Sequence, residues 1–231
     1  MDLSAGHVWV MVSAALVLLM TPGLAFFYGG MTRAKAALNM MMMSFVSIGL
    51  VGVVWVLWGY SMTGGDGIAG LFASPFAYFG LDGLIGTEDM ISAGFGATFA
   101  IITVALISGA IADRAKFGAW AVFVPVWVTL VYCPLAFMVW GGGLLGEEGA
   151  IGSVVGEAID FAGGTVVHIN AGVAALVLAL IIGKRRGFGS DPSHRPHNIP
   201  FVMLGAALLW FGWFGFNGGA AGTAEEAGLI W

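Results

Sequence analysis

The sequence predicts an all-α polytopic membrane protein with six transmembrane helices. Apolar residues make up 59% of the 231 residues and charged residues only 9%, and the mean hydropathy is +0.96. Soluble domains, in contrast, carry about 25% charged residues. Six long windows contain no charged side chain, and each can cross a hydrocarbon core of about 30 Å as one helix. This composition argues against a nucleic-acid-binding protein.

The six spans follow one another with short connections inside one domain, residues 1–231. The first window has no basic segment before it, so we interpret it as a retained helix and not as a signal peptide. We expect the spans at about residues 7–30, 38–62, 91–112, 118–140, 162–183 and 199–222.

Charged residues alternate between the two ends of these spans. Eleven of the thirteen acidic residues fall on one side. The positive-inside rule places the opposite, basic side in the cytoplasm and the N-terminus outside, as expected for a multi-pass protein of the plasma or inner membrane. An acidic outer surface would raise the local concentration of a small cation. The basic loops contain all eight Lys and Arg: Arg33, Lys35, Arg114, Lys116, Lys184, Arg185, Arg186 and Arg195.

The fifth span carries the most unusual polar residues. The stretch DFAGGTVVHINAG, Asp160 to Gly172, places a carboxylate, an imidazole and an amide at the start of an apolar run. A histidine inside a span is costly unless it faces a cavity or another polar group, so His168 is a functional candidate. On a continuous helix His168 lies about 12 Å from Asp160. The two residues could therefore mark two depths along one path through the membrane. Alternatively, Asp160 caps the helix, and His168 with Asn170 joins neighbouring helices.

Aromatic residues add a second set of candidates. Trp140 ends the fourth span on the acidic side, where an indole can attract a cation or simply anchor the helix at the interface. Phe99 and Phe216 lie within the third and sixth spans, and the residues alone favour ordinary packing for both. The methionine run Met40 to Met43 favours adaptable packing over a metal site. We expect no metal and no cofactor in this protein.

Glycine is abundant. It accounts for 38 of the 231 residues, which is more than twice the average share of about 7%. Small residues let helices approach closely in lipid, and we expect this role for the fifth-span cluster Gly163, Gly164, Ala171 and Gly172. The pattern Gly-x-x-x-Phe-x-Gly-Gly also occurs twice, from Gly23 and from Gly212. Spans one and six cross in opposite directions, as the first helices of two inverted repeats do. The chain then has one five-helix repeat and the start of a second, and looks truncated.

Five motifs together resemble the ammonium transporter family, the Amt/Mep/Rh proteins. They are TPGLAFFYGGM at Thr21, FGATFAIIT at Phe95, MVWGGG at Met138, DFAGGTVVHINAG at Asp160 and GWFGFNGG at Gly212. The motifs fall on five of the six spans in the order of the family, and cover about the first half of a member. The resemblance implies an eleven-helix fold of two inverted repeats and a final helix, assembled as a homotrimer with one pore in each subunit.

The resemblance also assigns roles. Trp140, Asp160 and Phe99 match residues that recruit ammonium at an outer vestibule, Phe99 and Phe216 match a pair that gates the pore, and His168 matches the first of two pore histidines. For the two phenylalanines this replaces the packing interpretation. Family members often have serine at the position of Ala220, glutamine at that of Gly96 and histidine at that of Phe137. Because alanine replaces the serine, the outer site here lacks one hydroxyl acceptor.

The function predicted by this resemblance is ammonium transport: recruitment, loss of a proton, and conduction of ammonia through an apolar pore. An ammonium sensor of the same family is the alternative, whereas an enzyme is not expected because no nucleophile supports Asp160 and His168. The loop from Lys184 to Arg195 could dock a cytoplasmic PII-type regulator or serve only to orient the helices. We expect these 231 residues not to conduct alone, since the second half of the pore is absent.

Overall fold

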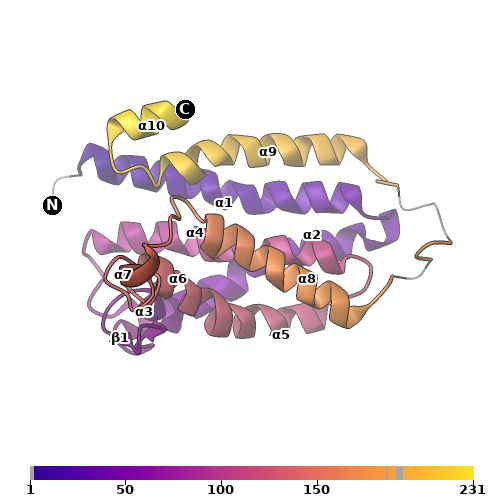
Figure 1. Cartoon of the computed structure of the whole chain (residues 1–231). Helices are drawn as coiled ribbons and strands as arrows, with labels where there is room; N and C mark the ends of the chain where they lie inside the picture. Colours follow the sequence, from indigo (N-terminus) through magenta and orange to yellow (C-terminus); the bar gives the residue numbers. More distant parts are fainter. Residues whose placement is uncertain (1–2, 186, 191–194) are drawn as a thin grey trace.

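The structure is a computed structural model that describes residues 3–185, 187–190 and 195–231. Figure 1 shows long helices lying side by side along one common direction. Six helices in the described part of the chain are long and apolar enough to cross a membrane. The predicted all-α fold with six transmembrane helices is therefore confirmed. The six are Ala5–Met31, Ala34–Thr63, Asp89–Ile111, Phe117–Trp140, Gly164–Ile182 and Ile199–Gly218.

Several of these helices contain a π-helical or 3₁₀ segment. The regular helices are α1 (Ala5–Met31), α2 (Ala34–Val54), α3 (Tyr60–Thr63), α4 (Asp89–Ile107), α5 (Phe117–Trp127), α6 (Cys133–Trp140), α7 (Gly152–Val155), α8 (Asn170–Ile182), α9 (Ile199–Gly218) and α10 (Ala224–Ile230). The π-helical segments are η1 (Trp55–Gly59), η4 (Val128–Tyr132) and η5 (Gly164–Ile169), and the 3₁₀ segments are η2 (Phe79–Leu81) and η3 (Ser108–Ile111). A two-stranded antiparallel ribbon, β1 (Gly67–Ile68) with β2 (Phe72–Ala73), follows α3.

Helices α1 and α9 lie side by side and run in opposite directions (Figure 1). Glycines allow their close approach. A Cβ on Gly205 would lie against the backbone nitrogen of Phe27 and 2.6 Å from the carbonyl oxygen of Gly23, and a Cβ on Gly23 would lie 2.9 Å from Leu208 Cβ. This antiparallel pair has the relation expected of the first helices of two inverted repeats.

The fifth-span glycines behave differently from the expectation. A Cβ added to Gly164 or Gly172 meets no atom within 4 Å among the described residues. The described chain therefore supplies no close helix neighbour at these two glycines, and a close interface there stays a prediction. Gly163 is needed for its backbone instead, because its φ of 107° is in the left-handed region. The helix consequently begins at Gly164, and Asp160 to Gly163 form a separate turn ahead of it.

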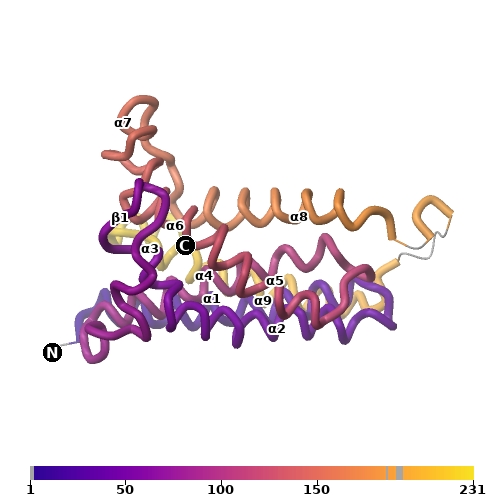
Figure 2. Tube along the Cα trace, turned by 90° about the horizontal axis from the view of Figure 1, so that it is seen from below, coloured from indigo at the N-terminus to yellow at the C-terminus, as the bar shows by residue number. Residues whose placement is uncertain are grey.

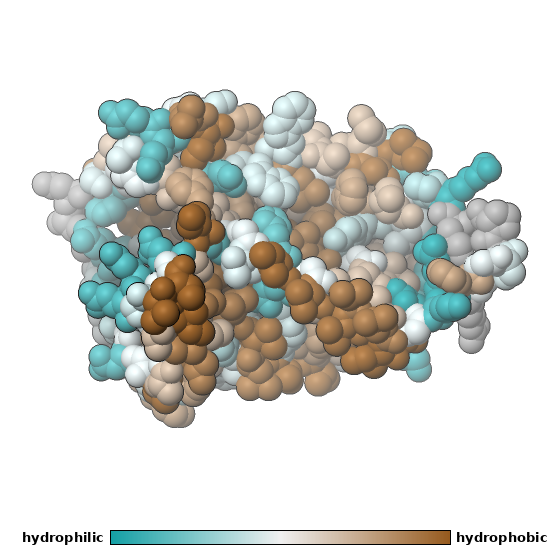
Figure 3. Space-filling view, viewed as in Figure 1, coloured by the Kyte–Doolittle hydropathy of each residue, from teal (hydrophilic) through white to brown (hydrophobic). Residues whose placement is uncertain are grey.

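Charged residues gather at the two ends of the bundle. The space-filling view in Figure 3 shows hydrophilic residues at both ends and mainly hydrophobic residues between them. We call the end with the α1–α2, η3–α5 and α8–α9 connections the basic end, and the opposite end the acidic end. Among the predicted basic-loop residues, Arg186 lies outside the described residues. Figure 2 shows the segments around β1 and α7 extending away from the bundle at the acidic end.

We expect Gly205→Ala to destabilise the chain by about 1–3 kcal/mol, because the new methyl group overpacks the backbone of α1. Thermal unfolding in detergent measures the effect as a lowered Tm. Gly49→Ala is the matched control, since Gly49 lies within α2 with no atom within 4 Å of its added Cβ, and alanine favours a helix. Equal Tm values for the two variants would contradict the proposed packing.

Candidate functional site

Two cavities follow one another from the acidic end into the bundle. The outer cavity has a volume of about 440 Å³ and the inner cavity about 170 Å³. Along α4 the lining residues advance from Ser92 to Phe99 in the outer cavity and from Ile102 to Leu106 in the inner one. The two cavities therefore lie at successive levels along α4. The outer cavity is lined by Val10, Trp55, Tyr60, Thr63, Ser92, Phe95, Gly96, Phe99, Tyr132, Ala136, Trp140, Phe161, Ala162, Gly219 and Ala220. The inner cavity is lined by Met20, Leu24, Phe27, Tyr28, Ile102, Leu106, Val167, His168, Leu209, Trp213 and Phe216.

A stacked pair of phenylalanines separates the two cavities. Phe99 from α4 lines the outer cavity and Phe216 from α9 lines the inner one. Their ring centroids are 4.4 Å apart with 28° between the planes, and the residues are only 4% and 1% exposed. Phe95 packs edge-on against Phe99 at 4.8 Å. Passage from one cavity to the other therefore requires these rings to move apart.

Trp140 forms a wall of the outer cavity at the acidic end. Its ring lies edge-on to Phe99, with centroids 6.3 Å apart and 83° between the planes. The indole Nε1–H donates a hydrogen bond of 3.1 Å to the carbonyl oxygen of Asp160. The residue is 42% exposed, so one part of the indole is held in place while another part faces the opening.

Asp160 caps the fifth span. Its Oδ1 accepts a hydrogen bond of 2.5 Å from the backbone nitrogen of Gly163, and its Oδ2 accepts bonds of 2.8 and 2.9 Å from those of Thr165 and Val166. The N–H groups of Thr165 and Val166 are among the first donors of the helix, which lack partners within the helix itself. The capping alternative is thereby confirmed. Asp160 is not among the described residues that line either cavity.

His168 lies in η5 and faces the inner cavity. Its imidazole is 5.8 Å from the ring of Phe216 and is stacked on Trp213 at 5.9 Å with 11° between the planes. Asn170 donates to the carbonyl oxygen of Val166 within the same span, at 3.1 Å. This bond is internal to the span, so it does not support the alternative that Asn170 joins two helices. In the described chain His168 belongs to the exposed residues, unlike the phenylalanine pair.

The sequence prediction missed two residues of the inner cavity. Trp213 supplies the ring that stacks on His168, and its position three residues before Phe216 places it on the same face of α9. Tyr28 also lines this cavity and donates a hydrogen bond of 2.9 Å from its hydroxyl to the carbonyl oxygen of Leu106. The motifs that contain both residues are visible in the sequence, but only the packing shows which of their aromatic residues face the cavity.

The departures from the family pattern fall in two different places. Gly96 and Ala220 line the outer cavity and offer no side-chain acceptor there. A Cβ on Gly96 would lie 2.9 Å from the ring of Trp55, so a longer side chain at this position would require that indole to move. Phe137 is only 2% exposed and packs beneath Gly67. Among the described residues no three metal-ligating side chains come together.

Comparisons with known proteins agree with the motifs. The model of the Ammonium Transporter Family matches residues 8–229. An ammonium transporter of Mycobacterium tuberculosis (strain H37Rv) is 54% identical over 240 residues, which cover 94% of this chain and 50% of that protein. The crystal structure of Candida albicans Mep2 superposes with a TM-score of 0.83 at 35% identity, covering 95% of this chain and 49% of that one. A structure described as a sensor Amt protein has a TM-score of 0.86 at 28% identity, covering 97% of this chain and 57% of that one.

The match extends over nearly all of this chain but only part of its relatives. The chain spans about half the length of the curated relatives it matches. Within that half, the helices and the motifs on five spans agree with one family. The chain belongs to the ammonium transporter family.

Proposed function

We propose that this chain provides the recruitment site and the first part of a transmembrane path for ammonium. The observation that carries the proposal is the continuous series of rings Trp140, Phe99, Phe216 and His168, with a cavity on each side of the stacked phenylalanines. The names of the curated relatives favour transport over the sensor alternative. Transport by the whole protein is part of this proposal, because the chain spans about half of those relatives.

Recruitment takes place in the outer cavity. The rings of Trp140 and Phe99 face it, and aromatic faces attract a cation by about 0.5–2 kcal/mol, depending on desolvation. The carboxylate of Asp160, held at the mouth by three backbone N–H groups, adds a negative potential behind the wall. Gly96 and Ala220 in this wall offer no side-chain hydroxyl. The attraction of the cation by the aromatic rings and by the negative potential takes the place of a hydrogen bond to such a hydroxyl.

Loss of the proton follows from what lies beyond the phenylalanine pair. The inner cavity is lined mainly by apolar and aromatic side chains, and carrying a bare cation into such surroundings is expensive. Ammonium can release a proton and continue as neutral ammonia, whereas potassium, of similar charge and size, cannot. A neutral imidazole at His168 both donates and accepts hydrogen bonds, so it can accompany ammonia or relay the proton. This step is the basis of the proposed selectivity.

The proposal extends to the setting of the whole protein. The sorting of charge between the two ends supports an N-terminus outside the cell, in the plasma or inner membrane. The family resemblance adds a homotrimer and a cytoplasmic PII-type regulator near Lys184 to Arg195. Cross-linking between subunits and pull-down with a PII protein test these two features separately from transport.

Ammonium-triggered current in proteoliposomes tests the path. We expect no current from the 231 residues alone, and a current from a chimera that joins this chain to the remaining part of the M. tuberculosis relative. His168→Ala in the chimera removes the donor and acceptor of the inner cavity and should lower the current on the order of 100-fold. His7→Ala is the control, because His7 contacts Glu88 outside both cavities. Full current in the His168→Ala chimera, or selective flux through the 231 residues alone, would contradict the proposal.

The phenylalanine pair is tested by its effect on selectivity. Phe216→Ala in the chimera would join the two cavities and admit water, so we expect potassium to compete more strongly with ammonium. Phe214→Ala is a matched control, since Phe214 lies two residues away on α9 and packs against Trp231. The ratio of ammonium to potassium currents is the measurement. An unchanged ratio in the Phe216→Ala chimera would rule out this pair as the selectivity barrier.

The two roles of Asp160 are separated by comparing stability with ammonium binding. Asp160→Ala removes the acceptors of three N–H groups and should cost about 1–3 kcal/mol for each group that is left buried and unpaired, measured by thermal unfolding. Asp160→Asn keeps one acceptor oxygen but no charge, so it should retain more stability while still weakening ammonium recruitment. Glu157→Ala removes an exposed acid of the same connection and is the control. Unchanged ammonium binding in a folded Asp160→Asn protein would leave Asp160 with the capping role alone.

A further inference from the structure

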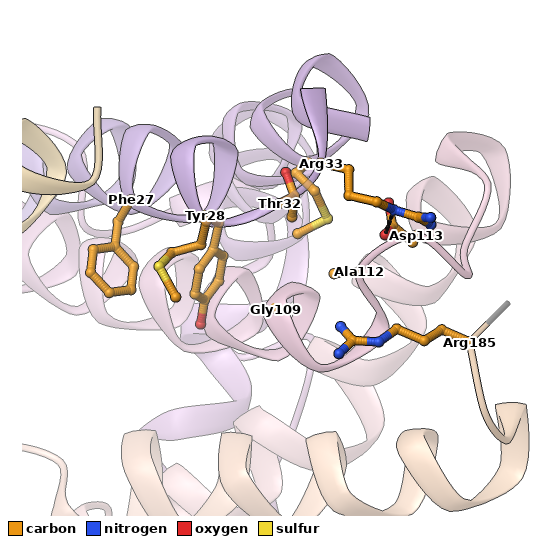
Figure 4. A pocket seen from close by; sticks show the side chains of 10 residues that line it. Phe27, Tyr28, Thr32, Arg33, Gly109, Ala112, Asp113 and Arg185 are labelled. Carbon is orange, nitrogen blue, oxygen red and sulfur yellow. Dashed lines mark hydrogen bonds and ion pairs between the residues drawn. The ribbon is translucent and has the colours of Figure 1, made fainter. Parts of the chain in front are cut away.

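The cavities at the two ends of the bundle differ in how they carry charge. The cavity in Figure 4, about 290 Å³, lies at the basic end, where Arg33 and Asp113 form an ion pair of 2.7 Å and Arg185 adds a further cation. The described lining of the outer cavity, in contrast, contains no charged side chain, and seven of its fifteen residues are aromatic. A cation that enters the outer cavity therefore meets aromatic rings and not a carboxylate.

The outer cavity is also larger than an ammonium ion needs. Its volume is about 440 Å³, whereas a water molecule, which is similar in size to ammonium, takes up about 30 Å³ of the liquid. Cavities of about 300–1,000 Å³ are typical of sites for small organic molecules. The outer cavity therefore has room for an organic cation.

π-helical segments place two of the aromatic residues at this cavity. Trp55 begins η1 and Tyr132 ends η4, and both residues line the outer cavity. The indole Nε1–H of Trp58 in η1 donates a hydrogen bond of 2.9 Å to the hydroxyl oxygen of Thr129 in η4, so the two segments are tied together. Such segments are rare within α-helices and occur frequently at functional sites. Their positions here favour a functional role for Trp55 and Tyr132.

Trp55 is the centre of a group of three aromatic residues. Its indole Nε1–H donates a hydrogen bond of 2.9 Å to the carbonyl oxygen of Ala93, which fixes the ring against α4. The centroid of the indole lies 6.0 Å from the ring of Tyr60 and 6.4 Å from that of Tyr132. All three aromatic residues line the outer cavity. We call Trp55, Tyr60 and Tyr132 the second wall of this cavity.

Gly96 makes room for the second wall. A Cβ on Gly96 would lie 2.9 Å from the ring of Trp55, so glycine at this position lets the indole reach the cavity. Gly96 and Ala220 bring no side-chain acceptor, and the hydroxyl groups of the described lining are those of Thr63, Ser92 and the two tyrosines. Ammonium needs acceptors for its N–H groups, whereas a quaternary ammonium ion has no N–H group and is recognised by aromatic faces. This lining therefore suits a quaternary ion.

We propose that the outer cavity is an aromatic cage for a quaternary ammonium ion, such as the trimethylammonium group of choline. The second wall and the rings of Trp140 and Phe99 surround the ion and hold it by cation–π attraction. The ion has no N–H proton to release, so it cannot pass the phenylalanine pair as a neutral molecule and blocks the path for ammonium. Binding depends on the outer cavity alone, whereas the block rests on the proposed function.

Isothermal titration calorimetry of the purified chain in detergent tests the cage. The probes are choline and its neutral isostere 3,3-dimethyl-1-butanol, in which a carbon atom replaces the charged nitrogen. We expect choline to bind on the order of tenfold more tightly, because only the charged probe gains cation–π attraction from several rings. Equal binding of the two probes would indicate an ordinary apolar pocket and overturn the cage. Absence of choline binding would overturn it as well.

Two pairs of variants test the second wall. Trp55→Leu removes a ring but keeps an apolar side chain, so it should weaken choline binding about fivefold. Trp210→Leu is the matched control and should bind choline normally, because Trp210 is 73% exposed and is not among the residues that line the outer cavity. Tyr60→Leu should also weaken binding, whereas Tyr60→Phe keeps the ring and should retain it. This second pair decides the matter if Trp55→Leu fails to fold.

The second wall is overturned by either of two results. One is equal affinity for choline in Trp55→Leu and Trp210→Leu. The other is an equal loss of affinity in Tyr60→Leu and Tyr60→Phe, which would assign the effect to the hydroxyl group and not to the ring.

The ammonium current of the chimera tests the block separately from binding. Choline added at the acidic end should lower the current and carry none itself, and the block should weaken in the Trp55→Leu chimera. A current that stays unchanged when the cavity is saturated with choline would overturn the block. A chimera without any ammonium current would contradict the proposed function instead, and the choline titration would still decide whether the cage exists.

Discussion

The close approach of α1 and α9 is the constraint on which the site depends. Gly23 and Gly205 let the two backbones meet, because a Cβ on either residue would strike the other helix. Helix α9 carries both Trp213 and Phe216, so its distance from the other helices fixes how far their rings reach. A wider separation of α1 and α9 would draw Phe216 away from Phe99, and the barrier between the two cavities would be lost. Gly205 thus influences the position of two aromatic side chains that lie eight and eleven residues further along α9.

The turn before the fifth span sets the other half of the site. Asp160 uses both carboxylate oxygens to hold three backbone N–H groups, and its own carbonyl oxygen accepts the indole of Trp140. One residue therefore positions the wall of the outer cavity and the start of the helix that carries His168. The backbone of this turn and the indole of Trp140 are therefore both held through Asp160.

The sequence predicted the broad arrangement well because it depends on long-range patterns. Uncharged windows indicated six spans, and the motif resemblance brought Trp140, Phe99, Phe216 and His168 to one route. Local backbone geometry was harder to predict. Glycine is compatible with a helix and with the left-handed region alike, so nothing in the residue type showed that Gly163 would end a turn while Gly164 begins the span. Trp213 was missed for a similar reason, since with 9 Trp and 17 Phe in the chain residue type alone does not identify the one ring that stacks on an imidazole.

Burial divides the site into two parts with different requirements. Phe99 and Phe216 are enclosed within this chain, and the outer cavity has walls from α1, α4, α6 and the residues that follow α9. His168, in contrast, is covered on one side by Trp213 and Phe216 and is otherwise exposed in the described chain. In the proposed path, attraction and desolvation of a cation would depend on the enclosed part, whereas passage of ammonia would need a wall opposite the imidazole that excludes lipid and water. Under that proposal, binding and conduction have different structural requirements, and the outer cavity could be studied as a cation site without a complete pore.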